Sequence, residues 1–450
     1  MSKTGITKRT TSLAFGLFII VLAFLAAYVA RKFSDRGAGA DVPEVIEGTV
    51  RVAPGAFLPR RVTVRPGGVL VFPTGSVRVP KKCGGSMQGA LRWPASAMEQ
   101  TKFFSADQAV TAHLAISFAK SGTVQHCSLA GYNGPVGDPR MRLAVAAEER
   151  LDIVGVRMQG VGHSESKPVF QARSLSLKGL FYSSDNRSVA QDNPFVAGEE
   201  IIVDGLTAEG LTGYASLFDC KKLDATNVDL KGVMCADMLV RGCDSAALHH
   251  VLLCACEIWP IKARKLYFER CTLANMDGSL ECESDTLSIT DSIFAALGLS
   301  LACENIALKG GILCSPDGSI SLGKSETRDN MIAVSATGTV ESSLLSVTSP
   351  DRKLFELFAN GKAPEKETPD VDGTLFMRGV VIVYAESVPE LKLHASARCE
   401  MCVMMGAEAV RSTPEGFKAV IYKGKKVPGE MLNRVALRPG LVTLLTSLPF

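Results

Sequence analysis

The chain has 450 residues, enough for two or three domains of ordinary size or for one long repetitive domain. Its 49 basic and 46 acidic residues nearly cancel, and no Lys/Arg run of the kind that binds phosphate is present, so nucleic acid is not expected as the main partner. With 46% apolar and 21% charged residues, the bulk of the chain is not disordered.

The N-terminal segment contains a long uncharged run over residues 10–30. At about 1.5 Å per residue, a helix of this length spans roughly 30 Å, the thickness of the hydrocarbon core of a bilayer. We therefore predict a single-pass transmembrane helix that is retained in the membrane. A cleaved signal peptide is the alternative, because Ala27 and Ala30 end the run with small residues. Basic residues flank the run on both sides and leave its orientation open.

A short pattern recurs through the middle of the chain: an apolar residue, any residue, a second apolar or small residue, any residue, and then a turn-prone residue. The nine copies begin at Leu151, Leu175, Ile201, Leu223, Leu239, Leu266, Leu287, Ile306 and Ile332. Their fifth positions are Gly155, Gly179, Gly205, Asn227, Cys243, Arg270, Asp291, Gly310 and Ala336. Six of these nine are Gly, Asn or Asp, which tolerate left-handed backbone angles and so predict a bend.

Each copy predicts a short strand, because positions one and three of a strand point to the same side. One such strand cannot bury its apolar face alone, so successive copies must stack. The expected fold is all-β: a parallel β-helix, or solenoid, in which inward side chains form ladders of like on like. A β-sandwich of short strands is the alternative.

The nine copies, and the opening segment from Glu47 to Pro80 with its Pro-Gly and Gly-Gly bends, resemble the right-handed parallel β-helix superfamily, the pectin-lyase-like fold. The resemblance covers roughly residues 45–348 and concerns the fold alone. It implies an architecture that hosts polysaccharide lyases and hydrolases.

The sequence predicts four segments. Residues 1–36 form the membrane anchor and its flanks, 37–350 the parallel β-helix, 351–372 a linker, and 373–450 a small β-rich module or a set of capping coils. Residues 81–112 fit the repeat poorly, and we expect them to form an insertion with one short helix.

The acidic residues give little support to a catalytic site. They are spread through the coils at changing positions of the repeat, and only Asp152 and Asp224, three coils apart, share a position. Lyases and hydrolases of this fold depend on clustered carboxylates. No catalytic residue is therefore predicted.

The most site-like place is the long insertion near Trp259, Arg264 and Lys265. An aromatic ring stacks on the apolar face of a sugar, and two cations follow it. We predict that these three residues contact a ligand, with a packing role for Trp259 as the alternative.

The thirteen cysteines do not indicate a metal site or a cofactor. Nine of them, Cys220 through Cys314, fall in the most regular coils, where small apolar thiols suit a narrow interior. Cys399 and Cys402 form a single C-x-x-C, which predicts a local disulfide or two packed thiols rather than zinc. Free thiols weaken the case for an oxidising compartment.

The leading hypothesis is a membrane-anchored β-solenoid that acts as a structural or adhesin-like binding protein of the cell envelope, with a polysaccharide or an envelope protein as its partner. Its soluble part is expected outside the cytoplasm. A polysaccharide lyase or glycosidase is the first alternative. A polymerising scaffold that faces the cytoplasm is the second.

Overall fold

The structure is a computed structural model. It describes residues 42–107, 111–130, 141–163, 167–183, 193–254, 260–315, 318–324, 331–347, 373–383, 390–400, 402–405 and 420–422. The regular elements of these ranges are β-strands, and no helix within them is long and apolar enough to traverse a bilayer. The predicted transmembrane helix lies outside the described residues.

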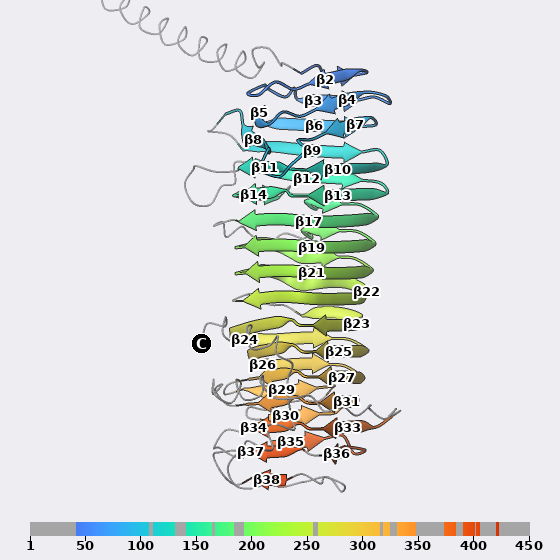
Figure 1. Cartoon of the computed structure of the whole chain (residues 1–450), viewed down its shortest axis with the longest axis vertical. Helices are drawn as coiled ribbons and strands as arrows, with labels where there is room; N and C mark the ends of the chain where they lie inside the picture. Colours follow the sequence, from blue (N-terminus) through green and yellow to red (C-terminus); the bar gives the residue numbers. More distant parts are fainter. Residues whose placement is uncertain are drawn as a thin grey trace, which may run out of the picture.

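The described strands form a parallel β-solenoid, as the repeat predicts, and the coil is consistent with a right-handed β-helix. Figure 1 shows a rod of stacked coils in which the strands lie across the long axis. Each coil runs over three faces, which we call face 1, face 2 and face 3. Every strand pairing is parallel and joins a strand to one in a neighbouring coil.

Face 1 begins with a small sheet of three strands and continues through the paired strands of the nine-copy region. Its strands are β2 (Thr49–Arg51), β4 (Val69–Val71), β7 (Ala90–Arg92), β10 (Ser121–Gln125), β13 (Arg150–Val154), the first half of β17 (Ser174–Ser183), β19 (Glu200–Glu209) and β21 (Lys222–Lys231), the middle of β22 (Met234–Cys254), most of β23 (Ile261–Glu269), β25 (Thr286–Thr290), β27 (Asn305–Lys309), β31 (Thr337–Glu341), β33 (Leu375–Arg378) and β36 (Arg398–Glu400).

Face 2 follows face 1 in each coil and includes the ends of the long strands β17, β19, β21 and β22. Its other strands are β5 (Gly75–Val79), β8 (Thr101–Ser105), β11 (Cys127–Ala130), β14 (Arg157–Gln159), the first parts of β24 (Thr272–Glu283) and β26 (Ile293–Ala302), β28 (Ile312–Cys314), β32 (Leu344–Ser346), β34 (Val381–Val383), β37 (Val403–Met405) and β38 (Val420–Tyr422).

Face 3 completes each coil and includes the start of β22 and β23 and the ends of β24 and β26. Its other strands are β1 (Val45–Ile46), β3 (Arg61–Val64), β6 (Lys82–Met87), β9 (Ala112–Phe118), β12 (Met141–Ala147), β15 (Val161–His163), β16 (Phe170–Gln171), β18 (Val196–Ala197), β20 (Thr212–Asp219), β29 (Ser319–Leu322), β30 (Met331–Val334) and β35 (Glu390–Leu393).

The bend between faces 1 and 2 has a left-handed backbone in coil after coil, and we call it the left-handed corner. Its residues are His126, Gly155, Gly179, Gly205, Asn227, His250, Arg270, Asp291, Gly310, Ser342 and Gly379, each with a positive φ. Glycine adopts this backbone without a steric cost, and Asn and Asp adopt it more readily than other residues. The corner therefore confirms the bend predicted at the fifth position of the repeat for seven of its nine copies.

For the other two copies, those from Leu239 and Ile332, the prediction of the bend is wrong. Cys243 and Ala336 do not lie at the left-handed corner, where the structure places His250 and Ser342 instead. The reason is that an alternating strand pattern is the same on every face, so the copies from Leu239 and Ile332 match strands β22 and β30 where these lie on face 3.

The core is a set of inward ladders along the solenoid axis. Leu151, Leu175, Ile201 and Leu223 lie in register on successive strands of face 1, and each is at most 1% exposed. Burial of one such side chain stabilises the fold by about 1.5–3 kcal/mol. These ladders are the physical cause of the repeat, because each coil covers the apolar side of its neighbours.

In the C-terminal coils, the strands of face 2 are buried on their outward side as well as on their inward side. Outward positions such as Thr272, Ile293 and Ile312 are only 0–2% exposed, whereas Arg157 is exposed at the same position of an earlier coil. Strands buried on both faces lose their alternation and become continuously apolar. The described strands β33 to β38 continue the stack by parallel pairing with β30, β31, β32 and each other.

The expected insertion over residues 81–112 is instead built from coil strands. Lys82–Met87 is β6, which pairs with β3 and β9 in regular register. Thr101–Ser105 is β8 on face 2. The poor fit to the repeat has a local cause: Gly84 and Gly85 take strand positions where the repeat has larger residues.

Candidate binding groove

The outer side of face 3 is shallow in the N-terminal coils because its outward residues are small. Gly84, Ala115 and Ala144 lie in register on β6, β9 and β12. A side chain added at Gly84 would meet no atom within 4 Å. The space left over these three strands is the floor of a groove.

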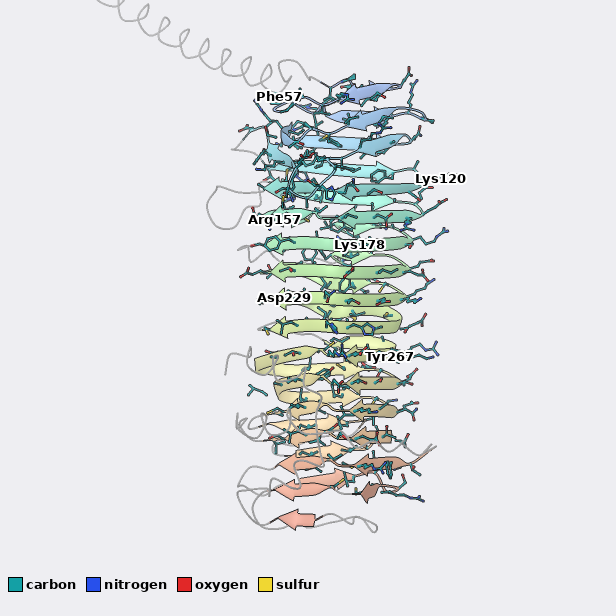
Figure 2. The ribbon with its side chains drawn as sticks, viewed as in Figure 1. Phe57, Lys120, Arg157, Lys178, Asp229 and Tyr267 are labelled. Atoms are coloured by element: carbon teal, nitrogen blue, oxygen red, sulfur yellow. The ribbon has the colours of Figure 1, made fainter. Side chains whose placement is uncertain are left out.

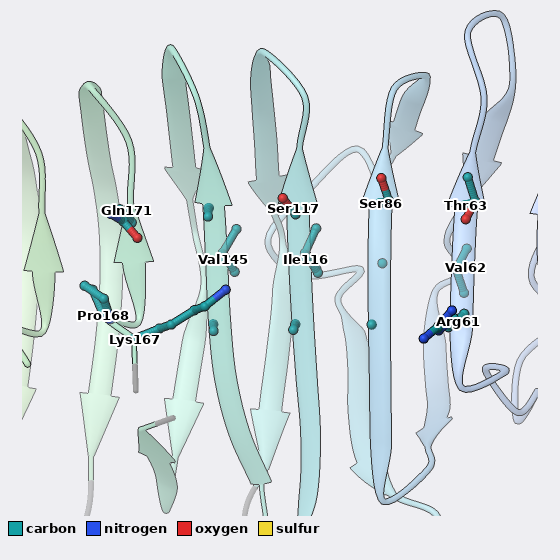
Figure 3. Close-up of a pocket in the computed structure, with 15 residues that line it drawn as sticks. Arg61, Val62, Thr63, Ser86, Ile116, Ser117, Val145, Lys167, Pro168 and Gln171 are labelled. Atoms are coloured by element: carbon teal, nitrogen blue, oxygen red, sulfur yellow. The ribbon is translucent and has the colours of Figure 1, made fainter. Parts of the chain in front are cut away.

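The groove has a volume of about 430 Å³ and crosses five strands, from β3 to β16 (Figure 3). Neighbouring strands lie about 4.8 Å apart, so the groove spans roughly 19 Å along the solenoid axis. Its long direction therefore runs from coil to coil rather than along a strand. This shape fits an extended chain better than a compact small molecule.

A row of polar side chains follows one side of the groove. Thr63, Ser86 and Ser117 lie in register on β3, β6 and β9, and Gln171 on β16 lines the far end. Hydroxyl and amide groups both donate and accept hydrogen bonds. At almost every coil, the row can therefore form a hydrogen bond with a ligand that is rich in oxygen atoms.

A cation lies at each end of the groove. Arg61 is on β3, and Lys167 precedes β16, where the hydrogen bond from Val145 N to Val169 O (2.8 Å) holds that segment beside β12. Figure 3 shows the Lys167 side chain extended toward β12. Both side chains are exposed, and no described Asp or Glu lines the groove. The groove is therefore complementary to negative charge.

The described lining residues of the groove include three hydroxyls, those of Thr63, Ser86 and Ser117, and no His, Cys, Asp or Glu is among them. Across all the described residues, no group of three or more His, Cys, Asp or Glu is placed to hold a metal ion.

The predicted ligand residues lie elsewhere. Arg264 and Lys265 are on β23, many coils away from the groove, and Trp259 lies outside the described residues. Lys265 is exposed between Ser245 and Thr286 of the neighbouring coils. Arg264 is instead held by two carboxylates, with its guanidinium 3.8 Å from Asp244 and 3.6 Å from Asp285.

Arg264 belongs to an outward column at the bend between faces 3 and 1, which we call the charged corner. Its residues are Lys120, Glu149, Arg173, Glu199, Lys221, Asp244, Arg264, Asp285 and Glu304. Figure 2 shows Lys120 at the edge of the coil stack. The sign of charge alternates along the column as far as Asp285. Glu304 then pairs with Lys324 at 3.0 Å, and Lys221 pairs with Glu199 at 3.5 Å.

The acidic residues differ from the sequence-based picture, because Glu149, Glu199, Asp244, Asp285 and Glu304 also share a position, the charged corner. The sequence pattern missed this column because the residues lie just before the repeat begins. Asp152 and Asp224 share one outward column of face 1, with Ser176 and Ile202 between them.

The described cysteines follow the prediction of buried thiols. Every described cysteine is free, and all but the half-buried Cys254 are buried. Burial raises the pKa of the Cys127 thiol to about 12.

Sequence reasoning missed the groove because its residues are small and common. The one available signal is the succession of Gly84, Gly85 and Ser86 in a stretch that otherwise alternates as a strand. Glycine inside a strand often marks a close approach of another backbone or of a ligand.

No family model matches the chain, and neither a curated protein nor a solved structure is found that resembles it.

Proposed function

We propose that this protein is a membrane-anchored rod of the cell envelope that binds an extended anionic chain, such as an acidic polysaccharide, in the groove of face 3. The observation that supports it is the charge of that groove: Arg61 and Lys167 at its ends and no described carboxylate along it. The anchor is the apolar run over residues 10–30. Kinship with the right-handed parallel β-helix superfamily is part of the same proposal.

The polar row and the length of the groove support a polymer as the ligand. A chain that crosses five strands can meet Arg61, the hydroxyls of Ser86 and Ser117, and Lys167 in turn. Two exposed cations give modest affinity and strong dependence on salt. We therefore expect weak binding at each groove, suited to attachment along a polymer rather than to capture of a free metabolite.

The test is calorimetric titration of the full-length protein in detergent with an oligogalacturonate long enough to cross the groove. The acid form should bind, and its fully methyl-esterified form, which keeps the backbone and loses the charge, should not. Reversal of both cations (Arg61→Glu with Lys167→Glu) should weaken binding at least about tenfold.

The matched control reverses two cations on face 1, Lys178→Glu with Lys222→Glu, and should retain the affinity. Equal binding of the acid and esterified oligomers would contradict the proposal, and so would loss of binding in the face 1 control. Release of shorter oligomers during the titration would assign the protein to the lyases or glycosidases instead.

A further inference from the structure

Two cysteines lie one above the other on consecutive coils, at the inner side of the charged corner. Asp219 and Arg241 are paired on β20 and β22; Cys220 directly follows Asp219, and Cys243 lies two residues after Arg241. The amide of Cys220 donates to Arg241 O at 3.1 Å, and one step further along the amide of Asp244 donates to Lys221 O at 2.7 Å. The two positions are thus fixed in adjacent layers by backbone bonds on both sides.

The two thiols are packed against each other in the interior. Cys220 is 3% exposed and Cys243 is 5% exposed, and their side chains are hydrogen-bonded to one another. The Cys243 thiol also lies 3.1 Å from Ser245 O. Adjacent strands lie about 4.8 Å apart, within the roughly 4.4–6.8 Å between Cα atoms that a disulfide requires.

We propose that Cys220 and Cys243 form a reversible disulfide that ties two consecutive coils together when the protein meets a disulfide oxidant such as glutathione disulfide. The Cys243 thiolate attacks one sulfur of the oxidant and expels one glutathione. Cys220, as its thiolate, then attacks the Cys243 sulfur of the mixed disulfide and expels the second glutathione. The protein loses two electrons and two protons, and the oxidant is reduced to two thiols.

The direction of the first step follows from the hydrogen bond between the thiols. That bond raises the pKa of Cys220 and lowers the pKa of Cys243, so Cys243 is the more readily ionised of the two. The thiolate is the attacking species in disulfide exchange. Cys243 is therefore the first nucleophile and Cys220 the resolving thiol.

A second close pair, Cys399 and Cys402, makes a useful comparison. These two are also hydrogen-bonded to each other, and both are buried, but they lie only three residues apart in the sequence. A disulfide there would close a very short loop, whereas one between Cys220 and Cys243 closes a whole coil. The chain-entropy effect on stability is larger for the longer loop.

The experiment is oxidation of the full-length protein with glutathione disulfide, followed by blocking of free thiols, proteolysis and mass spectrometry without reduction. The expected result is one cross-linked peptide pair per chain that joins Cys220 to Cys243. The melting midpoint should rise by roughly 5 °C and return to its first value with a reductant.

Three variants make the result decisive. Cys220→Ser and Cys243→Ser should each abolish the cross-link and the rise in melting midpoint, while Cys399→Ser with Cys402→Ser should keep both. Melting of each variant under reducing conditions reports whether it folds. Oxidation that leaves Cys220 and Cys243 unlinked in the folded protein, or that joins either to another cysteine, would overturn the proposal.

Discussion

Buried thiols make up part of the inward ladders of this solenoid. Cys83, Cys127 and Cys271 are at most 4% exposed, and Cys83 lies in register with Leu114 of the next coil. Burial raises the pKa of each thiol from 9.0 to about 12. The folded protein therefore holds these protons more tightly than the unfolded chain does.

The consequence is a loss of stability in alkali. Because the folded pKa lies above the unfolded one, the stabilisation is complete below pH 9 and is lost as the pH rises toward 12. Each thiol should contribute a loss of about 1 kcal/mol at about pH 10. Melting midpoints recorded from about pH 8 to about pH 11 should show a falling curve.

Cys127→Ala provides the control for this curve. It should lower stability at every pH because it leaves a cavity, but its curve should fall less steeply above pH 9. Parallel curves for the two proteins would show that the Cys127 thiol is not the titrating group.

Single residues also decide how much of the fold could be predicted. Gly155, Gly179 and Asn227 identified the left-handed corner from the sequence because their backbone freedom is a property of the residue itself. His250 and Ser342 adopt the same backbone without that signature. Their positions depend on the coils above and below, so the sequence pattern placed two copies on the wrong face.

The charged corner is a property of a whole column rather than of any one ion pair. An exposed pair contributes only about 0.2–1 kcal/mol, but Arg264 lies between Asp244 and Asp285 and interacts with both. From Lys120 to Asp285, the alternation of sign keeps like charges apart on neighbouring coils. The corner therefore favours one stacking register of the coils.

Arg264→Glu should disturb this column. It would create four consecutive acidic positions, and we expect a loss of about 1–2 kcal/mol at low salt that is largely relieved at high salt. The measurement is the melting midpoint at two salt concentrations. A salt-independent change would show that Arg264 acts through packing instead.

Lys265→Glu is the matched control for that substitution. It makes the same change in charge one residue away, but its neighbours in the stack are the neutral Ser245 and Thr286. We expect a change within about 0.5 kcal/mol and little dependence on salt.

The groove could not be predicted from the sequence because it depends on the alignment of several strands. Gly84, Ala115 and Ala144 are each unremarkable in the chain, and they form a floor only through the register of β6, β9 and β12. Trp259, Arg264 and Lys265 stood out because aromatic and charged residues are visible one at a time. A site formed by the absence of large side chains has no such marker.

The described coils form a rod, and the proposed anchor lies at one end of the chain. A truncated chain that begins at Gly37 should lose membrane association and keep its elongated shape, because each coil contacts only its neighbours. Membrane flotation checks the first expectation and small-angle scattering the second. A compact particle would contradict the solenoid in solution, and retained flotation would contradict the anchor.

Among the described residues, chain order is also spatial order: in Figure 1 their colours run from blue at one end of the rod to red at the other. Each coil adds one strand spacing, about 4.8 Å, to the length. The position of a described residue along the axis therefore increases with its residue number. Loss or duplication of a coil in the middle of the chain would change how far the tip reaches, while the groove would stay at its fixed height near the N-terminal end. Reach and binding can therefore vary independently of each other.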